Sequence, residues 1–151
     1  MNSENPVVKL CVQGMEGESK GNFDEASRLF LSAWSQSMND FERCIAAHYV
    51  ARHQKSPDEA LHWNQRSLDY ARAVGDETVS GFFPSLYLNM GKAYEDLRRL
   101  DDARHFYAMT AAALTSLPDD PYVRLIRDAV ERALERVLSL SRPCESPAFQ
   151  T

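Results

Sequence analysis

The sequence is poor in the residues that build cross-linked or membrane-spanning folds. Its three cysteines, Cys11, Cys44 and Cys144, lie far apart, so neighbours in the sequence form neither a disulfide framework nor a Cys-x-x-Cys zinc site. No apolar run approaches the roughly 18 residues that a membrane-spanning helix needs. The N-terminal residues MNSENPVV are polar and acidic, whereas a signal peptide is basic and then apolar. These absences predict a cytoplasmic protein that does not bind a membrane.

Glycine, proline and positive charge are also scarce. Only six glycines and seven prolines occur in 151 residues, and 44% of the residues are hydrophobic, which is typical of an ordered globular domain. The net charge is −5, which disfavours nucleic acid as a partner. We expect one domain over residues 1–140. The tail at 141–151 has two prolines and no periodicity, so we expect it to be disordered.

Three segments of the chain resemble one another. FDEASRLF, PDEALHWN and LDDARHFY each place an alanine in the same register, at Ala26, Ala60 and Ala103. The first two alanines are 34 residues apart and the last two are 43 apart. A period of about 34 residues is typical of a repeated helix-turn-helix unit, so we expect the same unit three times, with nine extra residues before the third alanine.

The third repeat carries the most specific motif. The motif begins with a large aromatic residue, then Leu-Gly after two residues and Tyr after two more. After eight further residues come an alanine and, four positions later, an aromatic residue. The matching residues are Tyr87, Met90, Gly91, Tyr94, Ala103 and Tyr107. This pattern resembles the tetratricopeptide repeat family, in particular its short bacterial members. The resemblance implies an all-α superhelix of stacked helical hairpins, in which Gly91 allows close approach of a neighbouring helix. The second repeat departs from the pattern at His48 and Asn64.

The predicted architecture is three hairpins and a capping helix, with about seven helices. The hairpins occupy about 7–40, 41–75 and 76–117, and an apolar stripe predicts a capping helix at 121–140. Prolines and capping residues mark the starts of several helices. The predicted helices are 6–20, 23–37, 40–54, 57–74, 78–98, 101–117 and 121–140. Pro84 leaves two alternatives open, because the fifth helix is either kinked there or begins near Phe83.

In the family that the chain resembles, the first helix of each hairpin lines a concave groove that binds extended peptides or helices. The helical register then predicts a partner-binding groove, and its candidate residues are Met15, Glu18, Tyr49, Arg52, His53, Leu88, Lys92 and Glu95. Relatives that clamp a peptide carboxylate use several Lys and Asn residues there, and that full pattern is missing here. His48 and His53 fall on different helical faces, so we predict no metal site.

Three functions follow from this sequence, and the first is the one we expect. It is a non-catalytic adaptor that binds a protein or peptide in the groove. The second is a structural module that forms a homodimer, rather than remaining a monomer, through the stripe of the C-terminal helix. The third is an enzyme such as a methyltransferase. Methyl transfer from S-adenosylmethionine usually requires a glycine-rich loop after a strand, and the sequence predicts neither, so we expect no catalytic residues and no cofactor.

Overall fold

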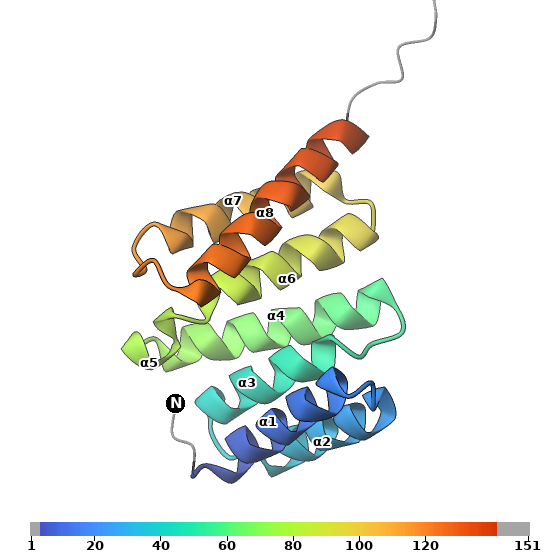
Figure 1. Cartoon of the computed structure of the whole chain (residues 1–151), viewed down its shortest axis with the longest axis vertical. Coiled ribbons are helices and arrows are strands. Elements are labelled where there is room, and N and C mark those ends of the chain that lie inside the picture. Colours follow the sequence, from blue (N-terminus) through green and yellow to red (C-terminus); the bar gives the residue numbers. More distant parts are fainter. Residues whose placement is uncertain (1–3, 142–151) are drawn as a thin grey trace, which may run out of the picture.

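The structure is a computed structural model that describes residues 4–141. Within this range it contains α-helices and turns and no β-strand, which confirms the predicted all-α fold (Figure 1). The helices are α1 (Pro6–Ser19), α2 (Phe23–Gln36), α3 (Asp40–Ala51), α4 (Pro57–Val74), α5 (Glu77–Ser80), α6 (Phe83–Asp96), α7 (Leu100–Leu114) and α8 (Pro121–Leu140). The tail predicted at 141–151 lies outside the described residues, except for residue 141.

The helices α1, α3, α4, α5 and α8 begin where a capping side chain accepts from one or two of their first backbone N–H groups. The side chain of Asn5 accepts from the amide of Val7 at 2.9 Å, and Oδ1 of Asp120 accepts from the amide of Val123 at 2.8 Å. A proline follows each of these two caps, at a position where its missing N–H costs nothing. Apart from the fifth predicted helix, each predicted start agrees with the structure to within one residue.

The enlarged third repeat places its extra residues between α4 and α6. Gly75 ends α4 with a φ of 65°, in the left-handed region that glycine adopts without strain. The short helix α5 follows, and α6 begins at Phe83. Pro84 therefore lies in the first turn of α6, where no intrahelical partner for its nitrogen is needed. Of the two predicted alternatives, the later start is confirmed and a kink is not needed. The short α5 is the helix that the predicted seven did not include.

The three hairpins are α1–α2, α3–α4 and α6–α7, and they stack in chain order. In the first and third hairpins a glycine receives an aromatic ring from the opposite helix. A Cβ atom added to Gly91 would lie 2.5 Å from the ring of Tyr107, and one added to Gly14 would overlap Phe30 in the same way. In the middle hairpin the large and small side chains are reversed. The larger His48 occupies the position of the glycine, and the smaller Asn64 occupies the position of the aromatic residue.

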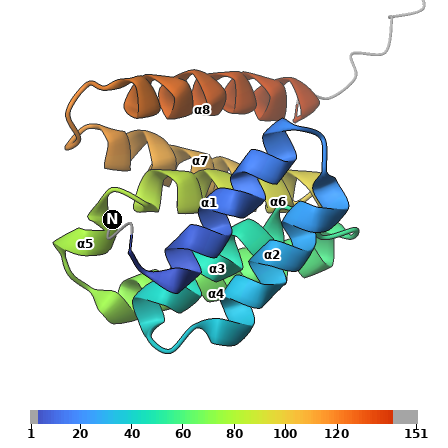
Figure 2. The ribbon, with the colours of Figure 1, turned by 60° about the horizontal axis from the view of Figure 1, so that its bottom comes forward.

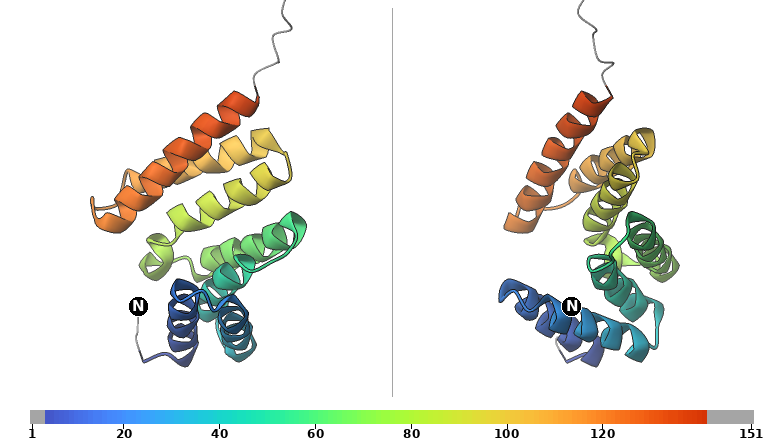
Figure 3. Two further views of the ribbon diagram at one scale, coloured as in Figure 1. Left: turned by 45° about the vertical axis from the view of Figure 1, so that its right-hand side comes forward. Right: turned by 90° about the vertical axis from the view of Figure 1, so that its right-hand side faces the viewer.

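The helix α8 packs on α7 and α6 and covers the last hairpin (Figure 2). Its side chains that face the repeats are all buried; they are Val123, Ile126, Val130, Ala133 and Val137. The stack curves, so that α1 and α8 lie at its two ends on the same side (Figure 3). The helices α3 and α6 form the middle of that concave side.

Candidate functional site

Four of the predicted groove residues form one cluster at the C-terminal ends of α1 and α3. Nε2 of His53 lies 2.8 Å from one carboxylate oxygen of Glu18, and the guanidinium of Arg52 lies 3.1 Å from the other. Arg52 also lies over the ring of Tyr49, 5.7 Å from its centre. That ring in turn stacks on Phe30 with their centres 5.0 Å apart. The structure thus brings Glu18, Tyr49, Arg52 and His53 together, and it pairs their charges with one another.

The remaining predicted residues are more dispersed. Met15 is partly buried against the core of the first two hairpins, and Leu88 packs on the core beneath α8. Lys92 is exposed and forms an ion pair with Asp96 one turn further along α6. Met15 and Leu88 are half-buried, and Lys92 alone of these three is exposed.

Glu95 is held under α8 rather than exposed in the groove. Its carboxylate accepts from Nε of Arg136 at 2.6 Å and from the hydroxyl of Tyr107 at 2.6 Å, and its side chain is 10% exposed. The bond to Arg136 is the largest of the causes that lower the pKa of Glu95. The register predicted that Glu95 faces the groove, but α8 covers this end of α6 and its Arg136 binds the carboxylate.

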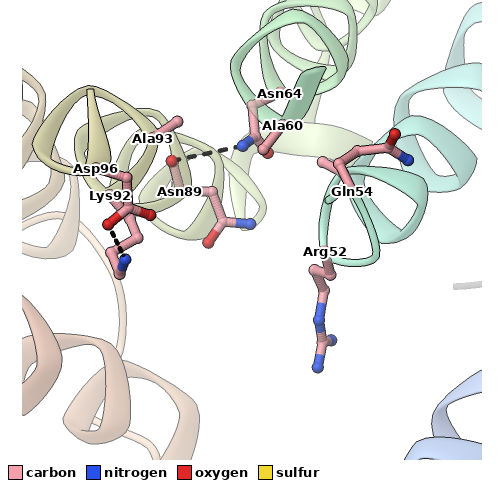
Figure 4. A pocket seen from close by; sticks show the side chains of 9 residues that line it. Arg52, Gln54, Ala60, Asn64, Asn89, Lys92, Ala93 and Asp96 are labelled. Atoms are coloured by element: carbon pink, nitrogen blue, oxygen red, sulfur yellow. Dashed lines mark hydrogen bonds and ion pairs between the residues drawn. The ribbon is translucent and has the colours of Figure 1, made fainter. Parts of the chain in front are cut away.

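A polar pocket of about 360 Å³ lies between the end of α3, the start of α4 and the C-terminal half of α6. Figure 4 shows Arg52 and Lys92 on opposite sides of this pocket, with Asn64 and Asn89 between them. Its complete lining is Ala51, Arg52, Gln54, Ala60, Asn64, Asn89, Lys92, Ala93 and Asp96. We refer to it as the polar pocket.

A second pocket of about 350 Å³ lies between α3, the start of α6 and the start of α8. It is lined mostly by apolar and aromatic side chains, namely Cys44, Ile45, His48, Tyr49, Phe82, Leu86 and Tyr122, together with Gly81 and Ser85. The hydroxyl of Tyr122 donates to the carbonyl of Gly81 at 3.1 Å, which fixes α8 at the rim. We refer to it as the apolar pocket.

His48 separates the two pockets and is held in its neutral form. Burial, with a smaller contribution from the positive charge of Arg52, lowers its pKa from 6.5 to about 4. Its Nδ1 lies 3.3 Å from Nδ2 of Asn89, and the amide nitrogen can only donate. The ring nitrogen therefore accepts this hydrogen bond, which the neutral imidazole allows.

The sequence interpretation did not place Asn64, Asn89, Phe82 or Tyr122 in the groove. Asn64 and Phe82 lie outside the first helices of the hairpins, and Tyr122 belongs to the capping helix. The departures at His48 and Asn64 were the available signal, because a repeat that loses its usual packing residues gains room for a pocket.

The two cysteines of the described residues are buried. Burial raises the pKa of Cys11 to about 12 and that of Cys44 to about 11, so both thiols stay protonated near neutral pH. Within residues 4–141 no group of three or more His, Cys, Asp or Glu side chains could hold a metal ion. In the same range no helix is long and apolar enough to cross a membrane.

Comparison with known proteins gives a partial similarity. No family model matches the chain. It is 33% identical over 104 residues to the vacuolar protein sorting-associated protein 16 homolog of Caenorhabditis elegans. The match covers 62% of this chain but 12% of that protein's length, so the chain spans only a small part of it. The tetratricopeptide resemblance therefore stays a prediction from the sequence.

Proposed function

We propose that the protein is a non-catalytic adaptor, which binds a peptide or a segment of a protein partner on its concave side. The observation that carries this proposal is the pair of adjacent pockets on α3 and α6, between the two ends of a curved helical stack. Pockets that combine apolar walls with a few polar groups are typical binding sites. The partial similarity to a protein associated with vacuolar protein sorting is consistent with a role in binding other proteins.

The two pockets share an accessible edge at Tyr49 and Arg52. Tyr49 lines the apolar pocket and Arg52 lines the polar pocket, and the guanidinium of Arg52 lies over the ring of Tyr49. Aromatic and arginine side chains carry much of the binding energy at protein interfaces. Removing both side chains should therefore weaken partner binding more than any other pair on this side.

The test compares capture of partners from the native host's lysate by three forms of the chain. The groove variant is Tyr49→Ala with Arg52→Ala. The matched control is Tyr70→Ala with Arg43→Ala, because Arg43 also lies 5.7 Å from the centre of a tyrosine ring. Arg43 and Arg52 are nine residues apart, which places them on opposite faces of α3. Neither control residue lines either pocket.

We expect the groove variant to lose captured proteins that the control and the wild type retain, at equal helicity by circular dichroism. Equal capture by all three forms would refute the groove as the binding surface. The alternative, self-association through α8, has lost part of its predicted surface, because Ile126, Val130, Ala133 and Val137 are buried within the chain, while Tyr122, Leu125 and Leu138 stay exposed. A dimer in sedimentation at micromolar concentration would revive that alternative.

A further inference from the structure

The side chain of Asn64 is buried, and its carbonyl oxygen has no hydrogen-bond partner. Asn64 is 7% exposed, and it lines the polar pocket. Its Nδ2 donates to the backbone carbonyl of Asn89 at 3.5 Å, and this carbonyl can only accept, which fixes the orientation of the amide. Among the buried side-chain nitrogens and oxygens of residues 4–141, Oδ1 of Asn64 alone has no hydrogen-bond partner.

Packing alone does not account for an asparagine at this position. Because His48 is larger than the glycine it replaces, a side chain smaller than an aromatic ring is needed at position 64. Leucine would fill a similar volume there without an unsatisfied oxygen. Buried polar atoms almost always have partners, and an unpartnered one lowers stability. An acceptor kept in the wall of a pocket is therefore suited to a donor that arrives with a ligand.

The charges around the polar pocket indicate that this donor is neutral. Arg52 is paired with Glu18, and Lys92 is paired with Asp96. An anionic ligand would have to compete with these two carboxylates, and a cationic ligand would approach two positive side chains. A carboxamide or a backbone amide offers an N–H donor without either conflict.

The apolar pocket adjoins this acceptor. Asn89 lines the polar pocket and His48 lines the apolar pocket, and their side chains are joined at 3.3 Å. Each pocket, at 360 and 350 Å³, is at the small end of ligand sites and suits one or two side chains. Side chains two positions apart in one extended segment point to the same side, roughly 7 Å from each other, so two of them can occupy both pockets.

We propose that the two pockets form one bipartite site for an uncharged peptide segment. An amide N–H of the segment donates to Oδ1 of Asn64, and an adjacent aliphatic or aromatic side chain enters the apolar pocket beside Tyr49 and Leu86. This inference rests on the proposed function, because it names the chemistry of the partner that the groove takes.

The test uses short random peptides displayed on phage and selected on the whole chain. Enriched peptides are synthesised with a fluorescent label, and their affinities are measured by fluorescence polarisation. Asn64→Leu removes the acceptor at similar volume. Gly81→Phe places a ring at the edge of the apolar pocket, since Gly81 lines this pocket and a Cβ atom there meets no atom within 4 Å. Gly81→Ala is its small matched control.

We expect enriched peptides to pair an apolar residue with an Asn or Gln two positions away, and to bind with little dependence on salt. Asn64→Leu and Gly81→Phe should each weaken binding about tenfold, while Gly81→Ala binds like the wild type. Selection of acidic or basic motifs, or unchanged binding by Asn64→Leu, would overturn the inference.

The same measurements separate this inference from the proposed function. If Tyr49→Ala with Arg52→Ala abolishes peptide binding while Asn64→Leu has no effect, the adaptor proposal stands and the bipartite site fails. If the selection yields no peptide that binds on the concave side, both fail.

Discussion

Gly91→Ala tests the packing that joins the two helices of the third hairpin. The added Cβ atom would lie 2.5 Å from the ring of Tyr107, which is closer than two carbon atoms that are not bonded to each other can approach. Tyr107 is fully buried, and its hydroxyl donates to Glu95 at 2.6 Å, so the ring has no free space to move into. The substitution must therefore displace either α7 or this hydrogen bond.

The expected change in stability combines three contributions. Overpacking a core costs about 1–3 kcal/mol, and losing a hydrogen bond to a charged group costs about 1.5–3 kcal/mol. Alanine returns about 1 kcal/mol through its higher helix propensity. If both costs apply, the free energy of unfolding should fall by about 1.5–5 kcal/mol. The melting temperature of a chain of this length should fall by about 2–4 °C for each kcal/mol.

Urea unfolding followed by circular dichroism measures this change. The matched control is Gly17→Ala, whose new Cβ atom would lie at an ordinary 3.6 Å from that of Ala26; it should be about 0.5–1 kcal/mol more stable than the wild type. The double variant Gly91→Ala with Tyr107→Leu should be more stable than the sum of its single changes predicts. The m-value reports whether the stacked hairpins still unfold together. A Gly91→Ala protein as stable as the wild type would refute the reasoning.

Further predictions concern three polar side chains. Arg136→Met should lower stability by about 1–2 kcal/mol at pH 7, because it leaves the buried carboxylate of Glu95 without its cation; the difference from the wild type should shrink in acid, as Glu95 becomes protonated. The lowered pKa of His48 means that the unfolded chain binds its proton more readily, so stability is full above pH 6.5 and falls between pH 6.5 and 4, by at most roughly 3 kcal/mol. His48→Gln should remove that dependence in urea titrations at several pH values, and an unchanged slope would assign it to other groups. Asn64→Leu should raise the free energy of unfolding by about 1 kcal/mol, and a destabilised variant would mean that Oδ1 has a partner in solution.

Most of the fold follows from local signals in the sequence. A capping asparagine, serine or aspartate followed by proline fixes where a helix begins, and the spacing of Ala26, Ala60 and Ala103 fixes the order of the hairpins. The register of α1 and α3 also brings Glu18, Tyr49, Arg52 and His53 into one cluster.

Which of those positions remain open depends on contacts between helices that are far apart in the sequence. The helix α8 crosses the end of α6 and takes Glu95 into an ion pair with Arg136, a contact across 41 residues that no local pattern encodes. The sequence shows that a large residue, His48, and a small one, Asn64, replace the usual glycine and aromatic residue. It does not show how the helices pack around them. Whether such an exchange closes a core or leaves two pockets depends on how α3, α4 and α6 pack in three dimensions.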